Sequence, residues 1–108
     1  MDVFELSRVA EERVRLGELY VEFLRVPSMS AGLYVLAAGR EDPQRPHAED
    51  EIYHVVRGRA TIRVADEDQA VGPGSVIYVA AGVPHRFHTI EEELEILVVF
   101  ASAERAGG

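Results

Sequence analysis

Apolar and polar residues alternate along much of this chain with the two-residue period of β-strands. In the clearest case, Glu51, Tyr53 and Val55 fall on one side of an extended segment, and the residues between them fall on the other side. Short apolar runs separated by glycine, proline and acidic turns recur from residue 18 to residue 101. This pattern predicts an all-β protein.

Turn-forming residues bound the expected strands. These strands cover residues 18–26, 32–38, 47–57, 60–64, 69–71, 75–79, 85–89 and 94–100. A tight turn is expected at Gly58, and the acidic residues 91–93 are expected to form a solvated connection between the last two strands. Before the strands, the segment from Leu6 predicts a short helix with Ser7 as its N-cap.

Several expected strands carry apolar side chains on both faces. Leu97 and Val99 lie opposite the main apolar face of the last strand, and Ile52 and Val56 do the same in the 47–57 strand. Outward apolar side chains on several strands indicate a covered outer face, most simply that of a two-fold homodimer. The alternative is that they are scattered surface residues.

Composition and charge narrow the functional classes. The 108 residues suit a single domain with one modest core, which we expect to span residues 1–108. The net charge of -8 would repel nucleic acids and anionic membranes, so neither is an expected partner. No run is long and apolar enough for a membrane span, and the start lacks signal-peptide features, so a cytoplasmic protein is predicted.

The absence of two residue types restricts the possible chemistry. The absence of cysteine excludes thiol nucleophiles, disulfides and sulfur-ligated metals. All 11 basic residues are arginines, which excludes Schiff-base chemistry by lysine.

Two histidines and one glutamate carry the candidate chemistry. His47 and Glu51 are four positions apart, so in a strand both can project from the same, mostly apolar face. Burying such polar groups without partners costs roughly 2–7 kcal/mol each. A metal ion would supply a partner, and His85 is the third candidate ligand. The alternative is a hydrogen-bonded polar cluster that holds no metal.

The spacing of these residues resembles the first of two short motifs of the cupin family. Six residues separate Glu51 from Gly58, and three separate His47 from Glu51, as in that motif. Arg45 stands where the motif has an additional histidine, which in cupins commonly serves as a fourth ligand. This departure implies weaker metal binding than in four-ligand cupins.

The second cupin motif is matched in part. Gly74, Gly82 and His85 stand at the spacings of its two glycines and its histidine. Ala80 and Thr89 replace its proline and asparagine. The fold is therefore indicated more strongly than any particular chemistry, because this barrel supports many functions.

The resemblance covers about residues 31–100 and implies a double-stranded β-helix, or jelly-roll barrel, at about residues 18–101. It also implies a divalent metal held by His47, Glu51 and His85. Two imidazoles and one carboxylate match the ligand set of non-haem Fe(II), so iron is favoured, with Zn, Mn, Ni and Co as alternatives.

Four further residues are candidates for contacts with a substrate. Arg45 either points outward or binds a substrate carboxylate at the mouth of the barrel. Gln44 could supply a weak oxygen ligand or a substrate contact. Tyr53 and Phe87 share the face of the ligands and are expected to line the pocket.

The remaining histidines are predicted to lie away from the metal. His54 and His88 each stand three positions beyond a candidate ligand, which places them on the opposite face of a strand. Both are expected at the surface or at an interface.

Two functions remain open. The first is a metal-dependent enzyme of dioxygenase or isomerase type that acts on a small organic molecule. The second is a non-catalytic small-molecule or metal-binding module that serves as a sensor or store. Both predict a small-molecule ligand and a homodimer.

Overall fold

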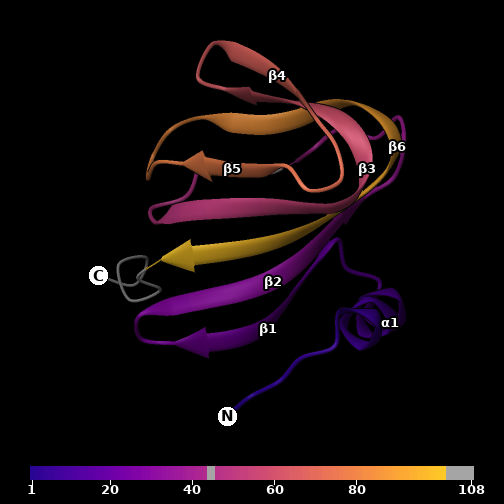
Figure 1. Ribbon diagram of the computed structural model, residues 1–108, viewed down its shortest axis with the longest axis vertical. Helices are drawn as coiled ribbons and strands as arrows, with labels where there is room; N and C mark the ends of the chain where they lie inside the picture. Colours follow the sequence, from indigo (N-terminus) through magenta and orange to yellow (C-terminus); the bar gives the residue numbers. More distant parts are fainter. Residues whose placement is uncertain (44–45, 102–108) are drawn as a thin grey trace.

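The computed structural model describes residues 1–43 and 46–101. Within them, one helix precedes six antiparallel strands in a strongly curved sheet (Figure 1). The elements are α1 (Leu6–Leu16), β1 (Tyr20–Val26), β2 (Met29–Leu36), β3 (Asp50–Val64), β4 (Glu67–Val71), β5 (Val76–Val79) and β6 (His85–Ala101). The strand order is β1-β2-β6-β3-β4, and β5 pairs with β3. The predicted all-β architecture with a short N-terminal helix is confirmed.

Strands β3 and β6 are longer than predicted, and they form the centre of the sheet. The tight turn expected at Gly58 is wrong, because β3 continues through it with φ at 95°. A Cβ atom there would lie 2.2 Å from the carbonyl oxygen of Glu93. Residues 91–93 are exposed, as expected, but they lie inside β6 and do not form a connection between two strands. Both strands bend with shifts in register instead of turning, because each pairs with the other along most of its length.

Helix α1 covers the outer face of β1 and β2 (Figure 1). Val9 packs there against the fully buried Leu33. The expected cap at Ser7 is wrong, because the N-cap position is Glu5, whose side chain makes no capping hydrogen bond with the described residues. The helix ends at Gly17, which adopts the left-handed conformation typical of C-terminal caps. In the described part of the chain, no helix combines the length and the apolarity of a transmembrane span.

The main core lies on the inner face of the curved sheet. It is built from inward-pointing side chains of β3 and β6, and Tyr53, Phe87 and Leu94 are fully buried there. The two-residue period predicted this inward set. Burial of each large apolar side chain contributes about 1.5–3 kcal/mol, so this core holds the two long strands in a fixed register.

Candidate metal centre

His47, Glu51 and His85 meet at one place on the inner face. One potential ligand atom from each lies within 4.8 Å of the others. Glu51 is the second residue of β3, His85 is the first residue of β6, and His47 lies in the loop before β3. The structure therefore brings together three groups that the sequence places up to 38 positions apart.

Two backbone amides of the turn before β6 hold the loop of His47 and the start of β3 in place. The amide of Gly82 donates to the carbonyl oxygen of His47 at 2.7 Å. The amide of Ala81 donates to Oδ1 of Asp50 at 2.8 Å. The glycine of the second motif thus fixes the segment that carries the first candidate ligand.

The His85 ring is oriented by its backbone neighbour. Its Nδ1–H donates to the carbonyl oxygen of Val83 at 2.8 Å, which turns Nε2 toward the centre of the cluster. There Nε2 lies 2.8 Å from Oε1 of Glu51 and 2.9 Å from Oη of Tyr53. Burial lowers the pKa of His85, but its contacts with Glu51 and Val83 outweigh this and raise that pKa above its ordinary value.

Glu51 provides the test of whether the cluster fits a metal. Its side chain is 1% exposed, and neither carboxylate oxygen has a hydrogen-bond partner among the described residues. Oε1 nevertheless lies 2.8 Å from Nε2 of His85, which is an ion-pair contact when this imidazole is protonated. A buried carboxylate without donors is costly, and a cation between it and the two imidazoles would remove that cost. Two nitrogens and one carboxylate are a suitable donor set for a divalent transition metal.

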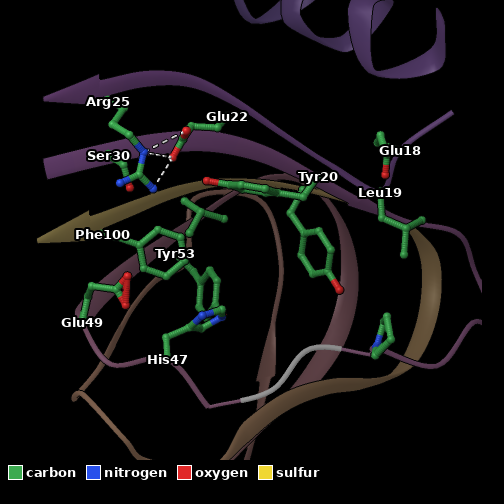
Figure 2. Close-up of a pocket in the computed structure, with 13 residues that line it drawn as sticks. Glu18, Leu19, Tyr20, Glu22, Arg25, Ser30, His47, Glu49, Tyr53 and Phe100 are labelled. Carbon is green, nitrogen blue, oxygen red and sulfur yellow. Dashed lines mark hydrogen bonds and ion pairs between the residues drawn. The ribbon is translucent and has the colours of Figure 1, made fainter. Parts of the chain in front are cut away.

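A cavity of about 500 Å³ adjoins the cluster (Figure 2). His47 and Tyr53 line it, whereas Glu51 and His85 do not. Its apolar wall includes Val98 and Phe100, and the ring of Phe100 stands edge-on to that of His47 at a centroid distance of 4.8 Å. A small molecule in this cavity therefore meets the cluster on the side of His47 and Tyr53.

The structure separates the predicted substrate contacts. Tyr53 lines the cavity, as expected. Phe87 is buried behind it, at a ring-centroid distance of 5.2 Å, and is not among the lining residues. Arg45 and Gln44, which the sequence places near the mouth, lie outside the described residues.

The other histidines do not join the cluster. His54 is exposed on the outer face of β3. His88 contacts Oδ1 of Asp68 through Nε2 at 2.8 Å and the hydroxyl of Thr89 through Nδ1 at 2.9 Å. Their predicted placement away from the ligands agrees with these positions.

Sequence reasoning missed the upper wall of the cavity. Tyr20 lies flat across β2, where a Cβ atom on Gly32 would come within 2.2 Å of its ring. Figure 2 shows Arg25 and Glu22 paired at this side, with Nη2 of Arg25 2.9 Å from Oε1 of Glu22. Gly32, which pairs with Glu22 and so lies diagonally next to Tyr20, was the available signal, but it has meaning only once β1 is paired with β2.

A second missed residue is Asp42, a buried acid in the loop after β2. Its carboxylate accepts hydrogen bonds from the hydroxyl of Tyr34 and from the amide of Phe87. Burial and this contact raise the pKa of Tyr34, which lines the cavity as a neutral phenol. Asp42 thereby ties the loop after β2 to β6 beside the cavity.

Comparison with known proteins agrees with this geometry. Residues 32–100 match the family model of the cupin domain. An uncharacterized protein from Streptomyces coelicolor is 51% identical over 104 residues, which cover 96% of this chain and 99% of that protein. The predicted resemblance to the cupins is confirmed by these matches.

Solved structures show the same barrel. A protein from Thermus thermophilus superposes with a TM-score of 0.75 at 24% identity, over 94% of this chain and 98% of that one. Salicylate 1,2-dioxygenase from Pseudoaminobacter salicylatoxidans, solved in complex with gentisate, gives a TM-score of 0.76 at 16% identity. That match covers 89% of this chain but only 31% of the dioxygenase. The fold is the predicted jelly roll, and the chain belongs to the cupin family.

Proposed function

We propose that this cupin binds one divalent metal ion through His47, Glu51 and His85 and acts on a small organic molecule as an enzyme of dioxygenase or isomerase type. The observation that carries the proposal is the buried carboxylate of Glu51, which has no hydrogen-bond donor among the described residues although it lies beside two imidazoles. Iron is the preferred metal, with Zn, Mn, Ni and Co as alternatives. A dioxygenase among the structural neighbours supports the reaction type.

The chain's own residues would perform distinct tasks around the ion. When bound, the metal supplies Lewis acidity or the activation of O2. The Val83 carbonyl keeps His85 Nε2 directed at the centre, so this ligand is positioned in advance. Tyr53 and Phe100 line the cavity with aromatic surface, against which the apolar part of a substrate would pack. The volume of about 500 Å³ suits a small molecule.

Three residues are proposed to contact that molecule, and a fourth, Phe87, is proposed to act through one of them. Tyr53 does so from the wall of the cavity, and Phe87 supports the Tyr53 ring from behind. Arg45 and Gln44 immediately precede Pro46 and His47 in the sequence, which supports a place for them near the mouth. We take the whole chain as one cytoplasmic domain.

A non-catalytic binding module is the second candidate. It is favoured by the side chains of Glu51 and His85, which are each 1% exposed and do not line the cavity. An ion held there would be shielded from large substrates. In that case the protein would sense or store a metal or a small molecule.

The test is elemental analysis of protein purified without chelators. The wild type should carry about one metal ion per chain, and His47→Ala and His85→Ala should lose it. His54→Ala is the matched control, because it removes an exposed imidazole from the outer face of β3. The absence of metal from the wild type, or its retention in both ligand variants, would refute the proposal. Turnover or O2 uptake on a panel of small organic molecules would then separate the enzyme from the binding module.

The proposal includes a homodimer formed through the outer face of β3 and β5. Ile52, Val76 and Tyr78 are 44%, 64% and 62% exposed there. Ile52 pairs with Tyr78 across the two strands, and His54 pairs with Val76, so these side chains form one uncharged strip. In a chain of net charge -8, an uncharged strip is the part of the surface on which two identical copies repel each other least.

A further inference from the structure

The phenol of Tyr53 contacts the same nitrogen that a metal would use. Tyr53 lies two residues after Glu51 on β3, so both side chains point inward. Its hydroxyl is 2.9 Å from Nε2 of His85. The other ring nitrogen of His85 is already engaged by the Val83 carbonyl. Nε2 is therefore the ligand atom of this imidazole, and the Tyr53 hydroxyl lies against it.

We propose that Tyr53 is a positioning residue whose hydroxyl holds Nε2 of His85 in the metal-free protein and is displaced toward the cavity when a metal ion binds that nitrogen. This inference rests on the proposed metal binding at His47, Glu51 and His85. A ring nitrogen has one position in the plane of the ring, which holds a hydrogen-bond partner or a metal but not both. The hydroxyl and the ion therefore compete for it.

The packing around Tyr53 determines where the displaced hydroxyl goes. The residue is fully buried, and the Phe87 ring stands edge-on behind it at 5.2 Å, so the phenol ring cannot swing out of the core. Tyr53 also lines the cavity, which Glu51 and His85 do not. A small shift of the hydroxyl away from Nε2 thus directs it at whatever occupies the cavity.

This arrangement would couple metal binding to ligand binding. A hydroxyl displaced from Nε2 loses that hydrogen bond, and a polar group on a cavity ligand would replace it. A ligand with such a group, beside the apolar surface of Val98 and Phe100, should bind the metal-loaded protein more tightly than the metal-free protein. By thermodynamic reciprocity, the same ligand should strengthen metal binding by the same factor.

The first test is the Zn²⁺ affinity of Tyr53→Phe, measured by competition with a chromophoric chelator. Removal of the competing hydroxyl should tighten Zn²⁺ binding about fivefold, which corresponds to one ordinary hydrogen bond. Tyr34→Phe is the control, because Tyr34 lines the same cavity but donates to Asp42 instead of to the cluster. Its Zn²⁺ affinity should match that of the wild type.

The second test follows the tyrosine ultraviolet absorption while Zn²⁺ is added. The wild type and Tyr34→Phe should show a difference spectrum that Tyr53→Phe lacks, because only Tyr53 changes its hydrogen bond. Unchanged Zn²⁺ affinity in Tyr53→Phe would overturn the proposal, because the hydroxyl would then not compete with the metal. Weaker Zn²⁺ affinity would also overturn it, because the phenol would then be a ligand of the metal. If the wild type itself fails to bind Zn²⁺, iron or any other divalent ion, the proposed metal-binding function is refuted, whatever Tyr53 does. The two failures are thereby distinguishable.

Discussion

The inner and outer faces of β3 depart from the usual distribution of polarity in opposite ways. On the inner face, Glu51 is 2% exposed and its carboxylate has no hydrogen-bond partner among the described residues. On the outer face, the adjacent Ile52 is 44% exposed, and it pairs with Tyr78 of β5, which is 62% exposed. Charged side chains are almost never fully buried unless paired, and extended apolar surface is seldom left in water.

The difference shows what each face lacks. The inner face has acceptors without a donor from the described residues, which a cation can satisfy. The outer face has apolar area without a cover, which another protein surface can satisfy. On α1 and β2, where Val9 covers Leu33, the chain provides its own cover, whereas Ile52, Val76 and Tyr78 on the outer face of β3 and β5 stay exposed. The following predictions test whether the two faces of β3 act independently.

The largest effect is expected from Glu51→Leu. Metal affinity should fall by at least about 100-fold, more than the loss that follows removal of a residue that only supports a ligand. At pH 8 and with a chelator present, the same variant should be more stable than the wild type by about 1–3 kcal/mol, because a buried carboxylate without a donor is gone. Elemental analysis and urea unfolding measure the two quantities. Glu49→Leu is the control, because it changes a cavity-lining acid outside the cluster, and it should retain the metal. If Glu51→Leu with chelator is less stable than the wild type with chelator, this interpretation of the inner face is contradicted.

The next effect concerns the bend in β3 at Gly58. Gly58→Ala should lower the free energy of unfolding by about 2–4 kcal/mol, because it combines a positive φ with a Cβ clash against the Glu93 backbone. Gly74→Ala is the matched control, since its φ is +91° but no atom lies within 4 Å of the added Cβ. That control should cost only about 1 kcal/mol. Equal losses in urea denaturation would show that backbone conformation, and not the contact with β6, makes Gly58 necessary.

The outer face is tested by Ile52→Asp. A charge in the uncharged strip should convert the dimer to a monomer, as measured by light scattering after size exclusion. The metal content should stay at the wild-type value, because Ile52 points away from the cluster. Ala70→Asp places the same charge on exposed β4, outside the strip, and should remain dimeric. A monomeric wild type would refute the homodimer, and loss of metal from Ile52→Asp would show that the faces are not independent.

The smallest effect is a pH dependence of the metal-free protein. The pKa of His85 is raised in the folded state above its ordinary value of 6.5, so folding favours the protonated imidazole. This contribution to stability is fully present below about pH 6.5 and fades as the pH rises through the higher folded pKa. Urea unfolding of chelated wild type and His85→Ala at pH 5.5 and pH 8.5 should show a larger difference between them at the lower pH. A stability difference between the two proteins that grows toward high pH would refute the prediction that folding raises the pKa of His85.

The local pattern was sufficient for the inward face but not for the course of the strands. Alternation placed Glu51, Tyr53 and Phe87 on the inside because side-chain direction in a strand depends only on position along it. The turn expected at Gly58 failed because a glycine with positive φ serves a tight turn or a bulge equally well. Pairing with β6 across the molecule decided between them.

The sequence by itself determined the family, the fold and the three groups proposed to hold a metal, because motif spacing and a two-residue period are readable from neighbouring positions. Only the tertiary structure decided that Tyr20 and Asp42 adjoin the cavity, that Phe87 lies behind Tyr53, and that the Tyr53 hydroxyl lies against His85. These contacts join strands and loops that are far apart along the chain. Their distances are set by the packing of the whole barrel, which no local pattern encodes.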